Sequence, residues 1–439
     1  MIDYELAINI INITFSVVIV AMLCISWYYV AGFFLSFKKI KRAPHSTAYT
    51  KFAVLVPARN ESKVVGNIMV ALNNQTYPKD RFDVWFIVES ESDPTYQLAL
   101  DNGYYAFVRD ELTEQRKTKG FALQECIRYF KKNEIRYDAY MIFDADNVMD
   151  PDYLEKMNDL RQSGVEVGVG YRNFTNANTN WLTSCSAILF TYLNSFASKN
   201  RTILFKKALL SGTGYYINSE IIDEAGGWIF TGLTEDTELT RYCLYHDINM
   251  RYYPGVNFYD EQSSSLKMNH YQHIRWVWGF IEKKKPFIVG GKNHHATSKI
   301  TNNAAKFEYT VGMFPFIGCV AIDAILSIVS LALFFASLHF NPAFSMTLLG
   351  YFFMQIGILY FLMSFVAATT IISNFNKLKL SFWTIVWSIL TYFFYVSDLI
   401  IAFFHGLFSA RARKTWKPIK HSGKIKDKRA KKVSKNEKE

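Results

Sequence analysis

The sequence predicts an α/β domain, built on a doubly wound sheet of parallel strands, inserted between membrane-spanning helices. Short apolar runs rich in β-branched residues alternate with helical patterns from about residue 50 to residue 145, which is typical of parallel α/β sheets. Polar residues follow several of these runs, and ligands of such sheets bind beyond the carboxyl ends of the strands. Long apolar segments lie on both sides of the domain, and each is long enough to cross a bilayer.

The expected elements of the domain follow one another along the chain. Strands are expected at 52–57, 82–88, 104–108 and 139–143, and helices at 64–72 and 120–130. Residues 181–210 mix aromatic, aliphatic and basic side chains, which fits either an amphipathic helix on the membrane surface or a surface helix packed on the domain. The sequence has no GxGxxG or Walker motif, which argues against a dinucleotide-binding fold and a P-loop NTPase.

Four apolar segments are expected to span the membrane: 13–37, 313–338, 348–373 and 382–408. The first carries no charge and lacks a basic n-region, so we expect a membrane anchor and not a cleaved signal peptide. Cations follow it at Lys38, Lys39, Lys41 and Arg42, and the positive-inside rule then places the next domain in the cytoplasm. The expected organisation is an N-terminal membrane helix (1–40), a cytoplasmic catalytic domain with interface helices (41–300), a C-terminal region of about three membrane helices (301–410), and a disordered basic tail (411–439).

The net charge of +11 is concentrated at one end of the chain. Residues 411–439 contain thirteen Lys and Arg against three Asp and Glu, and so hold ten of the eleven net positive charges. We interpret them as a solvated tail near anionic lipid headgroups and not as a nucleic-acid site. One N-terminal and three C-terminal spans would place this tail outside, against the positive-inside rule. Either one segment lies in the interface or the tail breaks the rule.

The five cysteines are scattered and include no CxxC pair. That distribution fits a reducing compartment and argues against a zinc site or a disulfide framework.

Two carboxylates, Asp144 and Asp146, follow the strand at 139–143. Carboxylates one residue apart at a strand end can hold Mg²⁺ or Mn²⁺, which prefer hard oxygen ligands and leave room for substrate phosphates. The alternative is that the pair only caps a turn.

Two further motifs follow in order. Thr234-Glu235-Asp236 offers a carboxylate base, and it also has the composition of a helix N-terminus. Gln272, Arg275 and Trp276 recur at i, i+3 and i+4 and therefore share one face of a helix. Arg suits diphosphate oxygens and Trp offers a flat surface to a sugar ring, whereas a headgroup-level anchor is the competing interpretation of the Trp residues.

With these motifs the chain resembles the membrane-embedded family 2 glycosyltransferases, which include synthases of cellulose, hyaluronan and poly-N-acetylglucosamine. The resemblance covers most of residues 50–290. The matching elements, in order, are Pro57–Glu61, Lys119–Leu123, Asp144–Asp146, Gly212–Gly214, Thr234–Asp236 and Gln272–Trp276. It implies a GT-A fold, a nucleotide-sugar donor and a Mg²⁺ or Mn²⁺ cofactor.

The resemblance also implies roles for individual residues. Asp236 matches the general base, and Asp146, with Asp144, matches the metal ligands. Donor binding is expected from Ala58, Asn60, Glu61, Glu89, Lys119 and Asp144, and acceptor binding from Glu235, Gln272, Arg275 and Trp276. The chain departs from the pattern at Glu89, where many members have the Asp that binds uridine; a UDP-sugar is the expected donor, and this departure puts the uridine in doubt.

The function expected from these motifs is inverting transfer of a sugar by a processive exopolysaccharide synthase. The alternative is a single-transfer enzyme that glycosylates a lipid acceptor, because the same motifs occur in enzymes of that type. A non-catalytic scaffold is disfavoured by the intact Asp146, Asp236 and Trp276. A transporter would rest on Asp323 and Asp398 alone, two charges within apolar segments. The expected partners are the donor, a growing polysaccharide or a lipid, and membrane lipids, with no nucleic acid; the sequence does not specify the sugar or any partner subunit.

Overall fold

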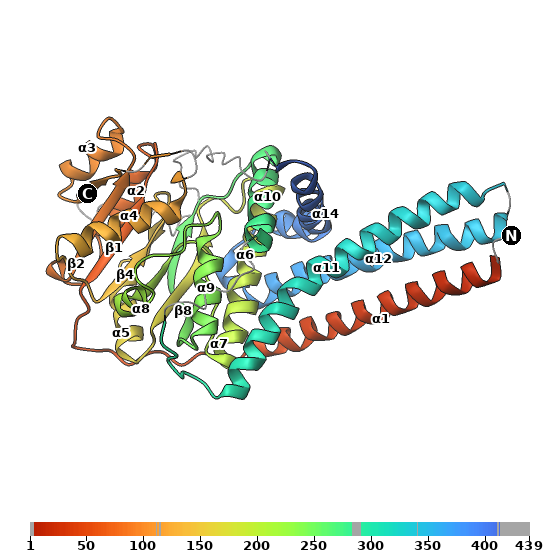
Figure 1. Ribbon diagram of the computed structural model, residues 1–439, viewed down its shortest axis with the longest axis horizontal. Helices are drawn as coiled ribbons and strands as arrows, with labels where there is room; N and C mark the ends of the chain where they lie inside the picture. The colour runs from red at the N-terminus through yellow and green to blue at the C-terminus, as the bar shows by residue number, and fades with distance from the viewer. Residues whose placement is uncertain are drawn as a thin grey trace.

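An α/β domain is joined to a group of long helices in the computed structural model (Figure 1). The structure describes residues 4–110, 112–113, 116–282, 291–339, 341–410 and 412. The strands are β1 Phe52–Pro57, β2 Phe82–Val88, β3 Tyr105–Val108, β4 Ala139–Ile142, β5 Val148–Met149, β6 Val167–Phe174, β7 Tyr215–Asn218 and β8 Met250–Asp260. The helices of the domain are α2 Val65–Asn73, α3 Pro94–Asp101, α4 Lys119–Lys132, α5 Tyr153–Gln162, α6 Trp181–Thr191, α7 Lys199–Phe205, α8 Ser219–Glu224, α9 Glu235–Tyr245 and α10 Leu266–Glu282.

One eight-stranded sheet forms the centre of the domain, in the order β3-β2-β1-β4-β7-β6-β8-β5. The first four strands are parallel, as the alternation of strands and helices predicts. The parallel order then stops, because β7 runs antiparallel to both β4 and β6, and β5 runs antiparallel to β8. The sheet is therefore mixed, and the α/β fold class is confirmed.

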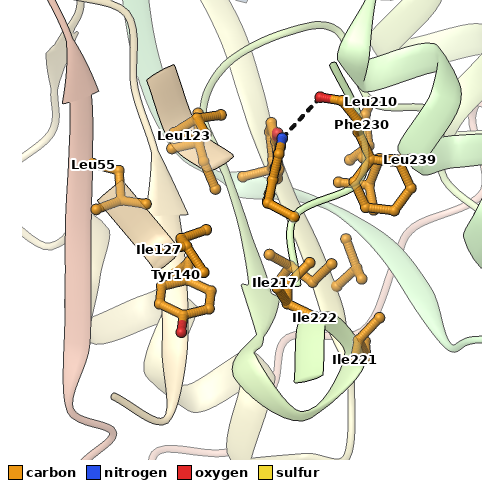
Figure 2. Close-up of a cluster of buried hydrophobic side chains, with 14 of the residues drawn as sticks. Leu55, Leu123, Ile127, Tyr140, Leu210, Ile217, Ile221, Ile222, Phe230 and Leu239 are labelled. Atoms are coloured by element: carbon orange, nitrogen blue, oxygen red, sulfur yellow. Dashed lines mark hydrogen bonds between the residues drawn. The ribbon is translucent and has the colours of Figure 1, made fainter. Parts of the chain in front are cut away.

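Both faces of the sheet are covered, which explains why its strands are continuous apolar runs. Along β1, Phe52, Val54 and Val56 pack into one core with α2 and α5, and Ala53 and Leu55 pack into a second core on the other face. Figure 2 shows this second core, where side chains of α4 meet side chains of β1, β4 and β7.

Long helices occupy each region predicted to cross the membrane: α1 Tyr4–Ser36, α11 Lys299–Ser337, α12 Pro342–Ser373 and α14 Phe382–Phe408, with the short α13 Phe375–Leu378 before α14. In Figure 1, α1, α11 and α12 run side by side away from the sheet, whereas α14 lies against α10. Among the described residues, α12 and α14 are long and apolar enough to cross a membrane. Among the described residues of α1 and α11, Asn9–Ala21 and Ile325–Ser337 are apolar stretches. The tail at 411–439 lies outside the described residues apart from Ala412.

The first part of the segment 181–210 differs from both sequence interpretations, because α6 is an interior helix and not a surface one. The segment forms α6, a π-helical turn η3 (Tyr192–Ser198) and α7. Nine of the eleven residues of α6 are buried, and the helix packs between β6 and α14. Its small side chains allow that approach: Ser388 of α14 donates a hydrogen bond to Ser184 at 2.8 Å.

Candidate active site

A cavity of about 480 Å³ lies at the carboxyl ends of β1, β2 and β4. α6, η3, α10 and α14 also contribute residues to its wall. Eleven of the twelve predicted site residues line it, although they are spread over more than 200 positions of the chain: Ala58, Glu61, Glu89, Lys119, Asp144, Asp146, Glu235, Asp236, Gln272, Arg275 and Trp276. The sheet topology thus brings the separate motifs together in one place, where open α/β sheets bind ligands.

Asp144 and Asp146 occupy the turn after β4. The backbone amide of Asp144 donates to Thr213 Oγ1 at 2.9 Å and to Asn147 Oδ1 at 3.2 Å. The Asp146 carboxylate accepts from Asn147 Nδ2 at 3.2 Å and from the amide of Glu261 at 3.2 Å. These bonds fix the turn, and both residues line the cavity.

The chemistry of this turn fits a divalent cation of the Mg²⁺ or Mn²⁺ type. Two carboxylates supply hard oxygen ligands, and such ions commonly bind to one or two carboxylates plus substrate phosphates and water. No cluster of three or more His, Cys, Asp or Glu side chains with metal-binding geometry occurs in the described part of the chain. The remaining ligands would therefore come from the donor and from water.

Lys119 lies between the two acidic groups of the cavity. It begins α4, and its Nζ donates to Asp144 Oδ1 at 2.5 Å and to the Gly212 carbonyl oxygen at 2.6 Å. Nζ is also 3.8 Å from Glu235 Oε1. Burial alone would lower the pKa of Lys119, but the Asp144 and Glu235 carboxylates outweigh it and raise that pKa above its ordinary value. The ammonium group therefore stays charged.

Glu235 and Asp236 form the first turn of α9. Burial raises the pKa of Glu235 to about 8, against the opposing effect of Lys119. Burial also raises the pKa of Asp236, although the Thr237 amide, which donates to its Oδ1 at 2.8 Å, and the cations Lys119, Arg275 and Arg172 favour the ionised form. The two residues therefore begin a helix and also line the cavity, and the role of general base stays a prediction.

The α10 helix presents Gln272, Arg275 and Trp276 to the cavity. Trp276 meets the ring of Phe190 edge to face, with 5.5 Å between centroids and an interplanar angle of 83°. This contact fixes the orientation of the indole and leaves part of it exposed to the cavity, because Trp276 is only half-buried. The competing idea of a simple headgroup anchor does not account for this position in the cavity wall.

The far end of the cavity holds a network of Arg and Glu residues. Arg59 Nε is 3.0 Å from Glu89 Oε2, and Arg109 Nη1 is 3.9 Å from Glu89 Oε1. Asn60 does not line the cavity; its backbone amide donates to Asp93 Oδ2 at 2.8 Å, and its φ is 56°. Asp93 caps α3 through the Thr95 amide. Glu89, and not Asp93, is thus the carboxylate that faces the cavity after β2, and a donor-binding role for Asn60 stays a prediction.

Arg172 and Asp260 are site residues that the motif analysis missed. Arg172 on β6 pairs with Asp260 at the end of β8, donates to the Ser211 carbonyl oxygen at 2.7 Å and lies 3.9 Å from the centre of the Phe190 ring. Both line the cavity. The available signals were an arginine inside the largely apolar strand β6 and an acidic residue at the end of β8. Only the long-range pairing of β6 with β8 makes them neighbours.

Thr213 gives a prediction for the metal-binding turn. Its hydroxyl accepts the Asp144 amide and donates to Asn147, which in turn bonds Asp146. In Thr213→Val this link is lost. We expect the apparent affinity for Mn²⁺ in nucleotide binding to fall about 10- to 100-fold, which is the usual effect of removing a residue that orients metal ligands. Mn²⁺ titration of nucleotide binding measures the effect. Thr213→Ser keeps the hydroxyl and is the matched control; equal loss in both variants would contradict this role.

Comparison with known proteins identifies relatives of the catalytic domain. The chain is 29% identical over 238 residues to the "Probable glycosyltransferase YdaM" of Bacillus subtilis, covering 52% of this chain and 55% of that protein. It is 27% identical over 241 residues to a "Beta-monoglucosyldiacylglycerol synthase" of Trichormus variabilis, covering 53% and 49%. It is 24% identical over 241 residues to the "Probable glucomannan 4-beta-mannosyltransferase 3" of Oryza sativa, covering 53% and 43%. The chain thus spans about half the length of the curated relatives it matches.

Structural comparison agrees on the fold. A solved mannosyltransferase of Pyrobaculum calidifontis, in complex with GDP-Man and Mn²⁺, superposes with a TM-score of 0.53 at 16% identity, covering 91% of this chain and 99% of that one. The model of the family described as "Glycosyltransferase like family 2" matches residues 50–279, more than half of the chain. The protein therefore belongs to glycosyltransferase-like family 2 and has a GT-A-like α/β core.

Proposed function

We propose that the protein is an inverting hexosyltransferase that moves a sugar from a nucleoside-diphosphate sugar to an acceptor hydroxyl. The observation that carries this proposal is the single cavity in which Asp144, Asp146, Asp236 and Arg275 meet. Such a transfer needs a base for the acceptor hydroxyl, positive charge for the departing diphosphate, and an acceptor held in line. Each need has a matching group in this cavity.

Asp236 is the proposed general base. Its burial raises its pKa, and a more basic carboxylate accepts a hydroxyl proton more readily. The hydrogen bond from the Thr237 amide at 2.8 Å holds its Oδ1, so that its second oxygen, Oδ2, is the one proposed to take the proton. The acceptor oxygen then attacks the anomeric carbon as the bond to the diphosphate breaks.

The proposed donor site is the end of the cavity that contains Asp144, Asp146 and Lys119. When bound, a divalent metal supplies positive charge to the diphosphate leaving group. Lys119, held at the start of α4, contributes a fixed cation beside Asp144. Glu89, with its partners Arg59 and Arg109, is proposed to contact the nucleoside. Arg275 also lines the cavity and is proposed as a second source of positive charge.

Glu235 leads to a prediction about pH. It keeps its proton up to about pH 8 in the folded protein, against an ordinary pKa of 4.5. Between these two pKa values the folded state therefore binds more protons than the unfolded chain. The contribution of protonated Glu235 to the stability of the fold is complete below pH 4.5 and is lost as the pH rises through 8. In the protein without nucleotide or metal, we expect the Tm of Glu235→Gln to fall less than that of the wild type from about pH 5 to about pH 8.5.

Thermal unfolding across that pH range measures the effect. Glu220→Gln, at an exposed position of α8, is the control, and its Tm should depend on pH with the same slope as that of the wild type. Equal slopes for wild type and Glu235→Gln would contradict the prediction.

Two classes of acceptor are proposed. A growing exopolysaccharide, expected from the motifs, is supported by Trp276, whose indole can stack on a sugar ring at the cavity wall. A lipid hydroxyl is supported by the aliphatic residues Leu189, Leu193 and Leu399 of the same wall. Leu399 belongs to α14, one of the two membrane-length helices, so a lipid could reach the cavity from that side.

The test uses the full-length protein in lipid nanodiscs with Mg²⁺ or Mn²⁺ and radiolabelled UDP-glucose, UDP-N-acetylglucosamine or GDP-mannose. Nucleotide release and product size are followed together. A ladder of products establishes a polysaccharide synthase, whereas one sugar per lipid establishes a glycolipid transferase. Absence of nucleotide release with every donor, in protein that binds nucleotide, would overturn the proposed activity.

We also propose that the catalytic domain faces the cytoplasm and that the long helices anchor it in the membrane. The exposed cations Lys38, Lys39, Lys41 and Arg42 directly after α1 support this orientation. Chemical labelling of residues of the catalytic domain, from the inside or the outside of sealed vesicles, tests this orientation.

A further inference from the structure

Four polar side chains form a cluster between α10 and α14, on a part of α10 that the proposed chemistry does not use. Asp398 of α14 contacts two histidines of α10: its Oδ1 is 2.7 Å from His270 Nδ1, and its Oδ2 is 2.7 Å from His273 Nδ1. His270 Nε2 is 2.9 Å from His405 Nδ1. His273 is fully buried. One carboxylate of a membrane-length helix thus holds two consecutive turns of α10.

The hydrogen-bond pattern assigns the histidine tautomers. An ionised carboxylate only accepts, so both His270 and His273 donate to Asp398 through Nδ1–H. His270 Nε2 is then free to accept from His405 Nδ1, and His273 Nε2 lies 3.4 Å from the hydroxyl of Tyr395. Burial lowers the pKa of His273, which keeps this imidazole neutral. In this arrangement one carboxylate accepts from both imidazoles of α10, and His270 also contacts His405.

The cluster lies on a different side of α10 from Gln272 and Arg275. At 3.6 residues per turn, His270, His273 and Ile274 share one side of the helix. Gln272 and Arg275 point the other way, and both line the cavity. A helix held firmly along one side presents its other side in a fixed orientation.

His273 also links the cluster directly to the cavity wall. Its ring packs on Trp276, with 5.2 Å between centroids, and Trp276 meets Phe190 on its other side at 5.5 Å. The guanidinium of Arg172 then covers Phe190. The indole is therefore held between Phe190 and His273, and His273 is hydrogen-bonded to Asp398 of α14.

The two helices are in close contact beyond the cluster. Trp278 Nε1 donates to the Phe403 carbonyl oxygen at 3.2 Å, and the two rings stack with 5.6 Å between centroids. At Gly406, an added Cβ would lie only 1.9 Å from Trp278 Nε1. These contacts hold α10 and α14 together independently of Asp398. A substitution at Asp398 should therefore change the orientation of α10 and leave its packing against α14 in place.

We propose that Asp398 is a positioning residue that fixes the acceptor-facing side of α10 through His270 and His273. This inference rests on the proposed acceptor role of Gln272, Arg275 and Trp276. Asp398 and His405 lie outside residues 50–279 that match the family. The structure thus places a determinant of acceptor geometry in a helix that the family match does not cover.

The test compares wild type with Asp398→Asn in full-length protein in phosphatidylcholine nanodiscs, with 5-fluorotryptophan at all nine Trp positions. Trp276→Phe assigns the Trp276 fluorine resonance. Asparagine has only one accepting oxygen and can satisfy only one of the two imidazoles. We expect the Trp276 resonance to shift or broaden, while the affinities for UDP and GDP with MnCl₂ stay within about twofold because the donor side is untouched.

Transfer is measured with dioleoylglycerol in the nanodisc as the acceptor probe and UDP-glucose or GDP-mannose as donor. Misplacing the acceptor side should lower kcat/KM for the acceptor by up to about 100-fold, with the donor KM unchanged. Asp398→Glu keeps two accepting oxygens and should recover part of the loss. Ser397→Ala is the matched control and should behave as wild type. Among the described residues, the Ser397 hydroxyl donates only to the Phe393 carbonyl oxygen of its own helix.

The histidines sharpen the test. His273→Gln should shift the Trp276 resonance more than His270→Gln, since only His273 touches Trp276. An unchanged Trp276 resonance in folded Asp398→Asn would overturn the proposal. An equal loss of UDP and GDP binding would also overturn it, because Asp398 would then stabilise the fold as a whole and not the acceptor side of α10. If the wild type transfers no sugar to dioleoylglycerol, that acceptor is wrong, and the Trp276 resonance still decides the role of Asp398.

Discussion

Replacing Asp236 by asparagine is expected to lower kcat by about 10²- to 10⁴-fold, the usual contribution of a general base. Asparagine has almost the same shape and can still accept the Thr237 amide, whose hydrogen bond to Asp236 Oδ1 is 2.8 Å. The α9 N-terminus should therefore stay intact. The amide cannot accept the proton of the attacking hydroxyl, so the chemical step alone should suffer.

The measurement is nucleotide release and product formation under saturating donor, together with nucleotide affinity. An unchanged affinity for UDP or GDP with a large loss of kcat supports the base. Asp223→Asn on α8, which does not line the cavity, is the control for the same change elsewhere. Full activity in Asp236→Asn would remove the assignment, and attention would pass to Glu235.

Replacing Asp146 by asparagine is expected to weaken metal-dependent donor binding by at least about 100-fold, because a ligand and its charge are both lost. The hydrogen bonds of Asp146 come from Asn147 and from the amide of Glu261. The asparagine carbonyl can still accept one of them, so the turn should keep its shape. The defect should therefore appear in the metal dependence and not in the folding of the domain.

Titration of Mn²⁺ at fixed UDP or GDP measures this effect. Asp150→Asn is a matched control, because Asp150 lies directly after β5, bonds Asn257 at 2.6 Å and does not line the cavity. An identical Mn²⁺ dependence in wild type and Asp146→Asn would count against the metal role.

The parts of the fold that could be predicted from sequence are those governed by local pattern. β1, β2 and β4 are buried on both faces, so each appears as a largely apolar run, such as Phe52–Pro57, with Asp83 of β2 as the exception. The polar residues directly after these strands meet at one edge because parallel strands end together. Asp144 and Glu89 could therefore be placed in one site without any knowledge of tertiary contacts.

The remaining features depend on pairings between distant segments. Arg172 reaches Asp260 because β6 and β8 pair across a register shift between Gly170 and Tyr171, and no local pattern encodes that shift. α6 mixes polar and apolar residues, and its burial becomes apparent only when α14 packs on it. Asp398, which the sequence shows only as a charge inside an apolar segment, acquires its two histidine partners in the same way.

The spacing of these partners along the chain has a consequence for biosynthesis. His270 and Asp398 are 128 positions apart, so at about 5 to 20 residues per second a ribosome needs roughly 6 to 25 seconds to make the second after the first. The nucleotide-binding half can fold during that interval, while α10 still lacks its partner. With the proposed roles of these residues, a nascent chain would bind donor before it could orient an acceptor, and sugar transfer would begin only once α14 has been made.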